Sequence, residues 1–127
     1  MMSFGQNVYI PDAIFKSYLV NNPLININGD GEIQVSEAIA YTGGISCGYA
    51  NISDLTGIEA FTALDYLNCR DNQITSLDVS NNTALTYLRC NDNQLTSLDL
   101  SNNTGLTQLY CETNLLECLN IKNGNLD

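Results

Sequence analysis

The sequence contains no histidine, and only 4 of its 127 residues are lysine or arginine. The absence of histidine removes the commonest general base, the commonest zinc ligand and the base of most serine and cysteine nucleophile systems. The sequence also has no nucleophile paired with a base, no phosphate-binding loop and no pair of catalytic carboxylates. Asp78 and Asp99 recur 21 residues apart, but repetition explains them better than catalysis. We therefore predict a protein that is not an enzyme.

Positive charge is scarce as well: the chain has 14 acidic residues and those 4 basic ones, which gives a net charge of −10. Such a chain repels the phosphate backbone of nucleic acid and anionic membrane surfaces. No apolar run approaches the ~18 residues that a membrane-spanning helix needs. We predict one domain that neither binds nucleic acid nor inserts into a membrane.

The first residues, MMSFGQ, are typical of the end of a secretory signal peptide. Ser3 and Gly5 occupy the small-residue positions of a cleavage site, which makes residues 1–5 a remnant and Gln6 the mature start. This pattern predicts a secreted or cell-surface protein. The alternative is the ordinary start of a cytosolic chain.

An internal repeat organises the rest of the chain. The segment LDYLNC at 64–69 recurs as LTYLRC at 85–90 and as LTQLYC at 106–111, a step of 21 residues each time. Between them, NQITSLDVSNNT at 72–83 returns as NQLTSLDLSNNT at 93–104. A weaker copy follows from Asn114, and Ile45 to Ile58 match the same frame with one extra residue before Leu64. We predict about four stacked coils over residues 42–127.

The pattern Leu-x-x-Leu-x-Cys-x-x-Asn-x-Leu resembles the leucine-rich-repeat consensus. Its Cys form, followed by NQLTSLDLS, is similar to repeats of bacterial secreted and surface proteins. The resemblance implies a leucine-rich-repeat solenoid with short parallel β-strands on a concave face. It also implies a non-catalytic binding module that uses this face for protein–protein interaction.

Local chemistry agrees with this fold. In Leu88-Arg89-Cys90 the alternation predicts a short strand whose Leu and Cys point inward. Stacked coils place such strands in a parallel sheet, roughly 4.8 Å apart. The remaining residues of each unit are rich in Asn, Ser, Thr and Asp, which predicts a mostly extended or loop convex side.

Two repeated residue types belong to the predicted scaffold. Asn72, Asn93 and Asn114 follow each strand and can bond the backbone of neighbouring turns. Four cysteines share one inward position, which predicts reduced core residues because parallel in-register side chains fit disulfide geometry badly; they are Cys47, Cys69, Cys90 and Cys111. Cys118 lies off this lattice and is a candidate for crosslinking between chains.

Residues 26–37, NINGDGEIQVSE, match the spacing of an EF-hand calcium loop. The ligands would be side chains and one backbone carbonyl, from Asn26, Asn28, Asp30, Glu32 and Glu37. A helix beginning at Pro11, with Ile14, Phe15, Tyr18 and Leu19 on one face, and a second helix over Ser36 to Tyr41 would flank the loop. Residues 6–41 are thus expected to form an α-helical N-terminal cap. Only two charged side-chain ligands are present, so the expected Kd is ~0.1–1 mM. The alternative is an EF-hand turn that shapes the cap without an ion.

The repeat frame also identifies the residues that point outward from the concave sheet. They are Tyr66, Asn68, Arg70, Tyr87, Arg89, Asn91, Gln108, Tyr110 and Glu112. Tyrosine and arginine are enriched in binding hot spots, and both arginines of the chain fall in this row. We predict a protein ligand, with a glycan as the second hypothesis. The alternative is that the tyrosines only pack between coils.

The last coil would expose Leu116, Leu119 and Ile121 if nothing covered it. An exposed coil edge favours pairing with another chain. We therefore expect either self-association there or further repeats in a longer adhesin-like protein.

Overall fold

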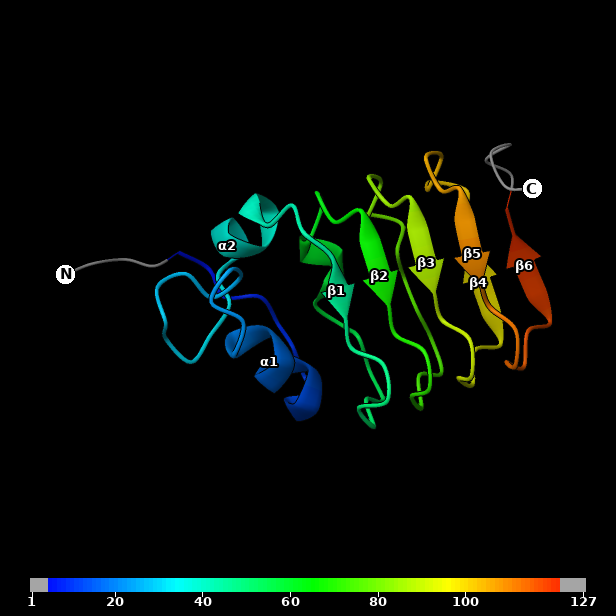
Figure 1. The fold of residues 1–127 in the computed structure, drawn as a ribbon, viewed down its shortest axis with the longest axis horizontal. Helices are drawn as coiled ribbons and strands as arrows, with labels where there is room; N and C mark the ends of the chain where they lie inside the picture. Colours follow the sequence, from blue (N-terminus) through cyan, green and yellow to red (C-terminus); the bar gives the residue numbers. More distant parts are fainter. Residues whose placement is uncertain (1–4, 122–127) are drawn as a thin grey trace.

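The computed structural model describes residues 5–121 and shows two short helices followed by a stack of coils (Figure 1). The helices are α1 (Ala13–Val20) and α2 (Val35–Ala40), and a short 3-10 helix spans Ile58–Ala60. The strands are β1 (Ile45–Ser46), β2 (Tyr66–Asn68), β3 (Tyr87–Arg89), β4 (Ser97–Asp99), β5 (Gln108–Tyr110) and β6 (Cys118–Asn120). Within residues 5–121, no helix has the length and hydropathy to cross a membrane. The predicted signal-peptide remnant lies almost entirely outside the described residues.

Four strands, one from each successive coil, form a parallel sheet in the order β1-β2-β3-β5. Leu67 pairs with Leu88, and Leu88 pairs with Leu109, so equivalent repeat positions lie side by side. Ile45 pairs with Leu67, 22 residues later, so the first coil is one residue longer than the 21-residue step. The leucine-rich-repeat solenoid and its parallel strands are thus confirmed. We call the solvent side of this sheet the four-stranded face.

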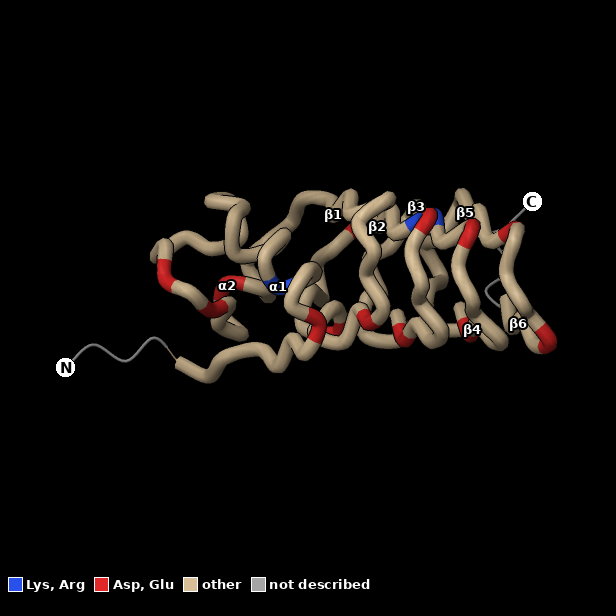
Figure 2. Tube along the Cα trace, turned by 90° about the horizontal axis from the view of Figure 1, so that it is seen from below, with Lys and Arg blue, Asp and Glu red and all other residues tan. Residues whose placement is uncertain are grey.

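The chain returns along the opposite side of each coil, where β4 and β6 form a second parallel pair. Both views of the backbone place these strands across the coil from the first sheet (Figures 1 and 2). Leu98 is buried between exposed Ser97 and Asp99, so this segment alternates like the first sheet. We call its solvent side the two-stranded face.

The α1 helix begins after Asp12, whose carboxylate accepts the backbone N–H groups of Ile14 and Phe15, both at 3.0 Å. A side chain of this type satisfies N–H groups that have no partner within the helix. The same carboxylate also accepts the N–H of Ser53 at 2.9 Å and therefore links the helix to the first coil. On the predicted apolar face of this helix, Phe15 and Leu19 are buried, whereas Ile14 is 45% exposed. Only part of this face therefore packs into the core.

A continuous apolar core runs through the coils and into the helical region. Cys47, Cys69 and Cys90 are buried in this core, and Cys111 is partly buried because it lies in the last described coils. Burial raises the pKa of the Cys47 and Cys90 thiols to about 12. The prediction that these cysteines are core residues is confirmed, and their thiols stay protonated at neutral pH.

The asparagine ladder is also confirmed. Asn93 donates to the carbonyls of Cys69 and Cys90 and accepts the N–H of Ile74 at 3.0 Å. Asn72 and Asn114 make the equivalent bonds one coil before and after. Each amide therefore bridges two neighbouring coils in the buried interior.

A second asparagine ladder lies on the return side. Asn82 is fully buried and donates to the carbonyls of Ile58 and Phe61, both at 2.9 Å. Asn103 makes the corresponding bonds to Val79 and Asn82. The sequence-based prediction missed this ladder, although the repeated SNNT motif contained the signal.

Candidate functional site

The predicted concave row lies on the four-stranded face, where strand alternation turns every second residue to solvent. Tyr66 and Tyr87 occupy paired positions on β2 and β3, and the same position on β5 is Gln108. Asn68, Arg89 and Tyr110 form the next row. Leu67 and Leu88 between these rows are completely buried, so the scaffold fixes the outward direction of the row.

The three tyrosines contact one another across the strands. The rings of Tyr66 and Tyr87 stack with their centroids 4.5 Å apart and their planes at 13°. Tyr87 and Tyr110 lie 5.7 Å apart at 45°. Tyr66 and Tyr87 are half-buried, whereas Tyr110 is 39% exposed. The tyrosines therefore pack between coils and still reach solvent. Packing between coils and exposure to a partner, the two alternatives raised by the sequence, are compatible at these residues.

Both arginines also lie against aromatic rings. The guanidinium carbon of Arg70 is 4.7 Å from the centroid of Tyr49, and that of Arg89 is 5.3 Å from the centroid of Tyr110. Cation–π contacts of this kind hold a guanidinium in place without neutralising its charge. Tyr49 was not among the predicted site residues. It occupies a turn position with a φ of +56°, equivalent to Asp71 and Asp92 in later coils.

The remaining predicted residues have different environments. Asn91 is buried at 5% exposure, accepts the Nε–H of Arg89 at 3.1 Å and donates to Asp92. Asn68 is half-buried and accepts the backbone N–H of Arg70. Gln108 and Glu112 are exposed. Asn91 can therefore act on a partner only through Arg89, whereas Gln108 and Glu112 are directly accessible.

The four-stranded face is uneven because its first strand carries little side-chain bulk. A Cβ atom at Gly44 would lie 2.9 Å from the Tyr66 ring, and one at Gly48 would lie 3.2 Å from Cγ of Arg70. These glycines let Tyr66 and Arg70 lean over the first coil. Side chains of the second coil therefore occupy the space beside β1.

Charge is also unevenly distributed. Red positions recur along both sides of the stack, and blue positions are few (Figure 2). Among the described residues, the ion pairs are Lys16 with Glu32 at 2.9 Å and Arg70 with Asp71 at 4.0 Å. Within residues 5–121, both arginines lie at the four-stranded face, whereas neither β4 nor β6 carries a lysine or arginine.

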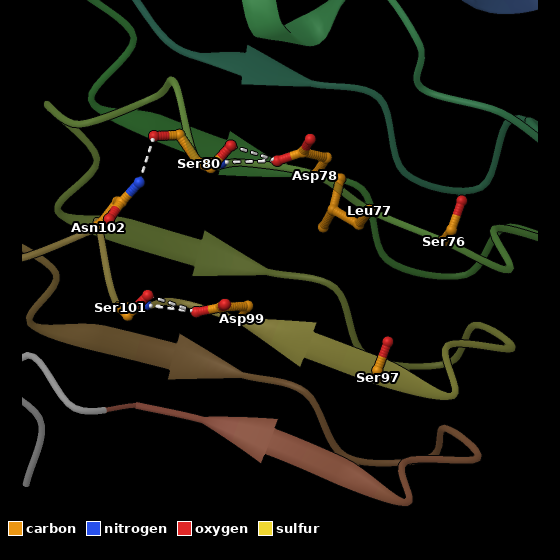
Figure 3. A pocket seen from close by; sticks show the side chains of 8 residues that line it. All are labelled: Ser76, Leu77, Asp78, Ser80, Ser97, Asp99, Ser101 and Asn102. Carbon is orange, nitrogen blue, oxygen red and sulfur yellow. Dashed lines mark hydrogen bonds between the residues drawn. The ribbon is translucent and has the colours of Figure 1, made fainter.

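The two-stranded face holds a polar groove of about 350 Å³. It is lined by Ser76, Leu77, Asp78, Ser80, Ser97, Asp99, Ser101 and Asn102 (Figure 3). Asp78 accepts both the N–H and the hydroxyl of Ser80, and Asp99 makes the same pair of bonds to Ser101. These bonds lower the pKa of both carboxyls. Each carboxylate thus closes a local turn, in agreement with the structural interpretation of the repeated Asp positions.

The predicted calcium loop between α1 and α2 keeps its shape through its own hydrogen bonds. Glu37 accepts the N–H groups of Ile27 and Asn28 with Oε1 and that of Gln34 with Oε2. Asp30 accepts the N–H of Glu32 and two side-chain amides, from Asn28 and Gln34. A cation would have to compete with these donors.

Asn26 is the predicted ligand that best fits an ion. Its side chain is 5% exposed, and its Oδ1 atom has no hydrogen-bond partner. Its Nδ2 donates to the carbonyls of Val20 and Asp30, which leaves only the oxygen for a further contact. Glu32, whose carbonyl was the predicted ligand, uses its side chain to pair with Lys16. In the described part of the chain, no three Asp, Glu or Cys side chains gather into a metal-binding group.

The last described coil presents an exposed apolar edge. Leu119 is 41% exposed and Ile121 is 42% exposed, and the thiol-bearing Cys118 beside them is exposed too. Self-association at this edge and crosslinking through Cys118 stay predictions.

No protein-family model matches this chain, and no curated protein matches it. Solved structures do. The functional domain of InlJ from Listeria monocytogenes, which includes a cysteine ladder, is 34% identical with a TM-score of 0.74, and the match covers 99% of this chain and 31% of that one. An internalin, InlF, from Listeria monocytogenes is 26% identical with a TM-score of 0.72, over 93% of this chain and 38% of that one.

Internalin C2 of the same species is 18% identical, with a TM-score of 0.55 over 100% of this chain and 72% of that one, and supports the fold alone. The similarities to InlJ and InlF support a bacterial leucine-rich-repeat fold. The chain spans about a third of the length of the first two proteins.

Proposed function

We propose that this chain is a non-catalytic binding module of a secreted or cell-surface bacterial protein, and that it captures a protein partner on the four-stranded face. The observation that carries the proposal is the cluster of Tyr66, Tyr87, Arg89 and Tyr110 on that face. Buried positions are nearly constant from coil to coil, whereas these outward positions combine aromatic rings with a guanidinium. Such side chains dominate binding energy in protein interfaces.

The arrangement of the rings favours a protein over a glycan. A sugar that stacks on tyrosine needs an open ring face, yet Tyr66 and Tyr87 turn their faces toward each other at 13°. What remains accessible are ring edges, hydroxyl groups and the exposed Tyr110. Because these side chains are already held by one another, little rotamer entropy is lost when a partner binds.

Replacement of Tyr87 and Arg89 by alanine tests the proposal. We expect each substitution to weaken capture of the partner by about thirtyfold or more, since a hot-spot residue contributes ~2 kcal/mol to binding. Proteins retained from host-cell extracts by wild-type and variant chains would be compared by mass spectrometry and by binding titration of the enriched protein. Ser76→Ala, an exposed substitution on the two-stranded face, serves as the matched control.

Thermal melting of each variant decides between binding and packing. An unchanged melting temperature with lost capture supports the proposal. Collapse of the Tyr87→Ala variant would show that the ring mainly holds the coils together. Capture of a glycan with equal loss on substitution would replace the protein partner with a sugar.

We also propose weak calcium binding in the loop of residues 26–37, with Asn26, Asn28, Asp30, the Glu32 carbonyl and Glu37 as ligands. The buried Oδ1 of Asn26, which lacks a partner, supports this proposal. At a Kd of about 0.5 mM, 5 mM calcium would stabilise the fold by about 1.4 kcal/mol. Calorimetric titration and melting with calcium, against magnesium and against Glu37→Gln, measure it. Absence of both heat and a melting shift at several millimolar would remove calcium from the account.

A further inference from the structure

Both arginines of the chain lie within one small area of the four-stranded face. Arg89 pairs with Asn68 across β2 and β3, and Arg70 lies two residues beyond Asn68. The two arginines are therefore diagonal neighbours, with Cα atoms roughly 7–8 Å apart. In a chain of net charge −10, this pairing of its only guanidinium groups is unusual.

Each guanidinium is fixed, and the two lean in opposite directions along the stack. Arg70 lies over Tyr49 of the first coil, and Arg89 lies against Tyr110 of the coil that follows its own. Nε of Arg89 is held by the buried amide of Asn91. Gly48 makes room for Arg70, because a Cβ there would come within 3.2 Å of Cγ of that arginine. The area between the two arginines is thus flanked by positive charge on both sides.

The neighbouring carboxylates leave the terminal donors of both guanidinium groups available. The nearest approach of Arg70 to Asp71 is 4.0 Å at Nε, which is too long for a hydrogen bond. Asp92 is engaged by the side-chain amide of Asn91. Among residues 5–121, no hydrogen bond is made by the terminal nitrogens of either guanidinium. These planar groups therefore present donors in the geometry that suits a carboxylate.

We infer that the four-stranded face recognises an acidic segment of its protein partner, in which Asp or Glu carboxylates bind between Arg70 and Arg89. This inference rests on the proposed function and specifies the chemistry of the partner. A protein segment fits better than an acidic sugar because the stacked faces of Tyr66 and Tyr87 are closed to sugar rings. The local positive charge, set in an otherwise acidic surface, provides the complementarity.

Selection from a displayed library of random 12-residue peptides against the whole chain tests this directly. We expect Asp and Glu to be enriched over the unselected library. The strongest peptides and their Asn and Gln counterparts would then be titrated by fluorescence anisotropy against wild-type, R70Q, R89Q, R70K/R89K and Y87A chains. K16Q removes one positive charge on α1 and is the matched control.

The inference predicts at least a tenfold loss of affinity in R70Q and R89Q, with partial recovery in R70K/R89K and none of this loss in K16Q. The amide counterparts of the peptides should lose a similar factor. Selected peptides without acidic enrichment, or with unchanged affinity for R70Q and R89Q, overturn the inference. If Y87A still abolishes their binding, the proposed function survives. Peptide binding that is unchanged in Y87A overturns both the inference and the proposed function. Arginine-dependent binding of sialylated glycans in place of peptides also overturns both.

Discussion

The two faces of the stack differ in how their exposed residues relate to the repeat. On the two-stranded face, Asp78-Val79-Ser80 and Asp99-Leu100-Ser101 repeat the same local hydrogen bonds (Figure 3). On the four-stranded face, the position of Tyr87 becomes Gln108 one coil later. The recurring Asp and Ser positions make the same bonds in successive coils, whereas a position that changes from Tyr to Gln is not fixed by the fold. Tyr66 and Tyr87 recur and stack on each other, so these two positions combine packing between coils with a candidate binding role.

Removal of a buried ladder amide should give the largest effect. Asn93→Ala leaves the N–H of Ile74 without its partner in the core, while the carbonyls of Cys69 and Cys90 keep only their bonds from Asn72 and Asn114. An unsatisfied buried group costs about 1–3 kcal/mol and each further lost hydrogen bond costs about 1 kcal/mol, so we expect the free energy of unfolding to fall by about 3 kcal/mol. Urea denaturation measures it.

Asn81→Ala is the control for the ladder, because Asn81 is an exposed asparagine of the same repeat. It should change stability by less than about 0.5 kcal/mol. Equal effects at the two positions would mean that burial of the amide does not determine its contribution to stability.

Replacement of Asp12 by alanine should give an intermediate effect. The substitution removes the N-terminal cap of α1 and its bonds to Ser53 and Asp54, at 2.9 and 3.3 Å. Loss of a cap alone costs about 1 kcal/mol, and we expect about 1–2 kcal/mol in urea denaturation. Asp12→Asn keeps an acceptor oxygen and should therefore lose less stability than Asp12→Ala. Identical losses in both variants would contradict the capping role.

Acidification should give the smallest effect, spread over three carboxyls. Partial burial would raise the pKa of Asp12, but four backbone N–H bonds outweigh burial and lower it. The Ser80 and Ser101 hydroxyls are the main cause of the lowered pKa of Asp78 and Asp99. Because a folded pKa below 3.8 favours the ionised folded state, this stabilisation is complete above pH 3.8 and is lost as the pH falls through the folded values.

Melting of wild-type and Asp78→Asn/Asp99→Asn chains between pH 7 and pH 2.5 would measure the acid effect. The small advantage of the wild-type chain should disappear at the acid end. An advantage that grows on acidification would show that the serine bonds do not favour the ionised carboxylates.

The sequence by itself determined the solenoid, its parallel strands and the inward cysteines and asparagines. These follow from local rules, since a 21-residue recurrence forces equivalent residues into register and alternation sets which of them point inward. The outward row of Tyr66, Tyr87 and Tyr110 follows from the same rules, although its role as a binding site stays a prediction.

Only the tertiary structure decided how the outward side chains meet. Tyr49 reaches Arg70, Asn91 is drawn inward to hold Arg89, and Gly48 opens the space that Arg70 crosses. The second ladder at Asn82 likewise needs the carbonyls of another coil. Most of these contacts join residues about one coil apart, and the rotamers of these residues depend on the bulk of their neighbours. A repeat pattern fixes positions but not the directions in which long side chains lean.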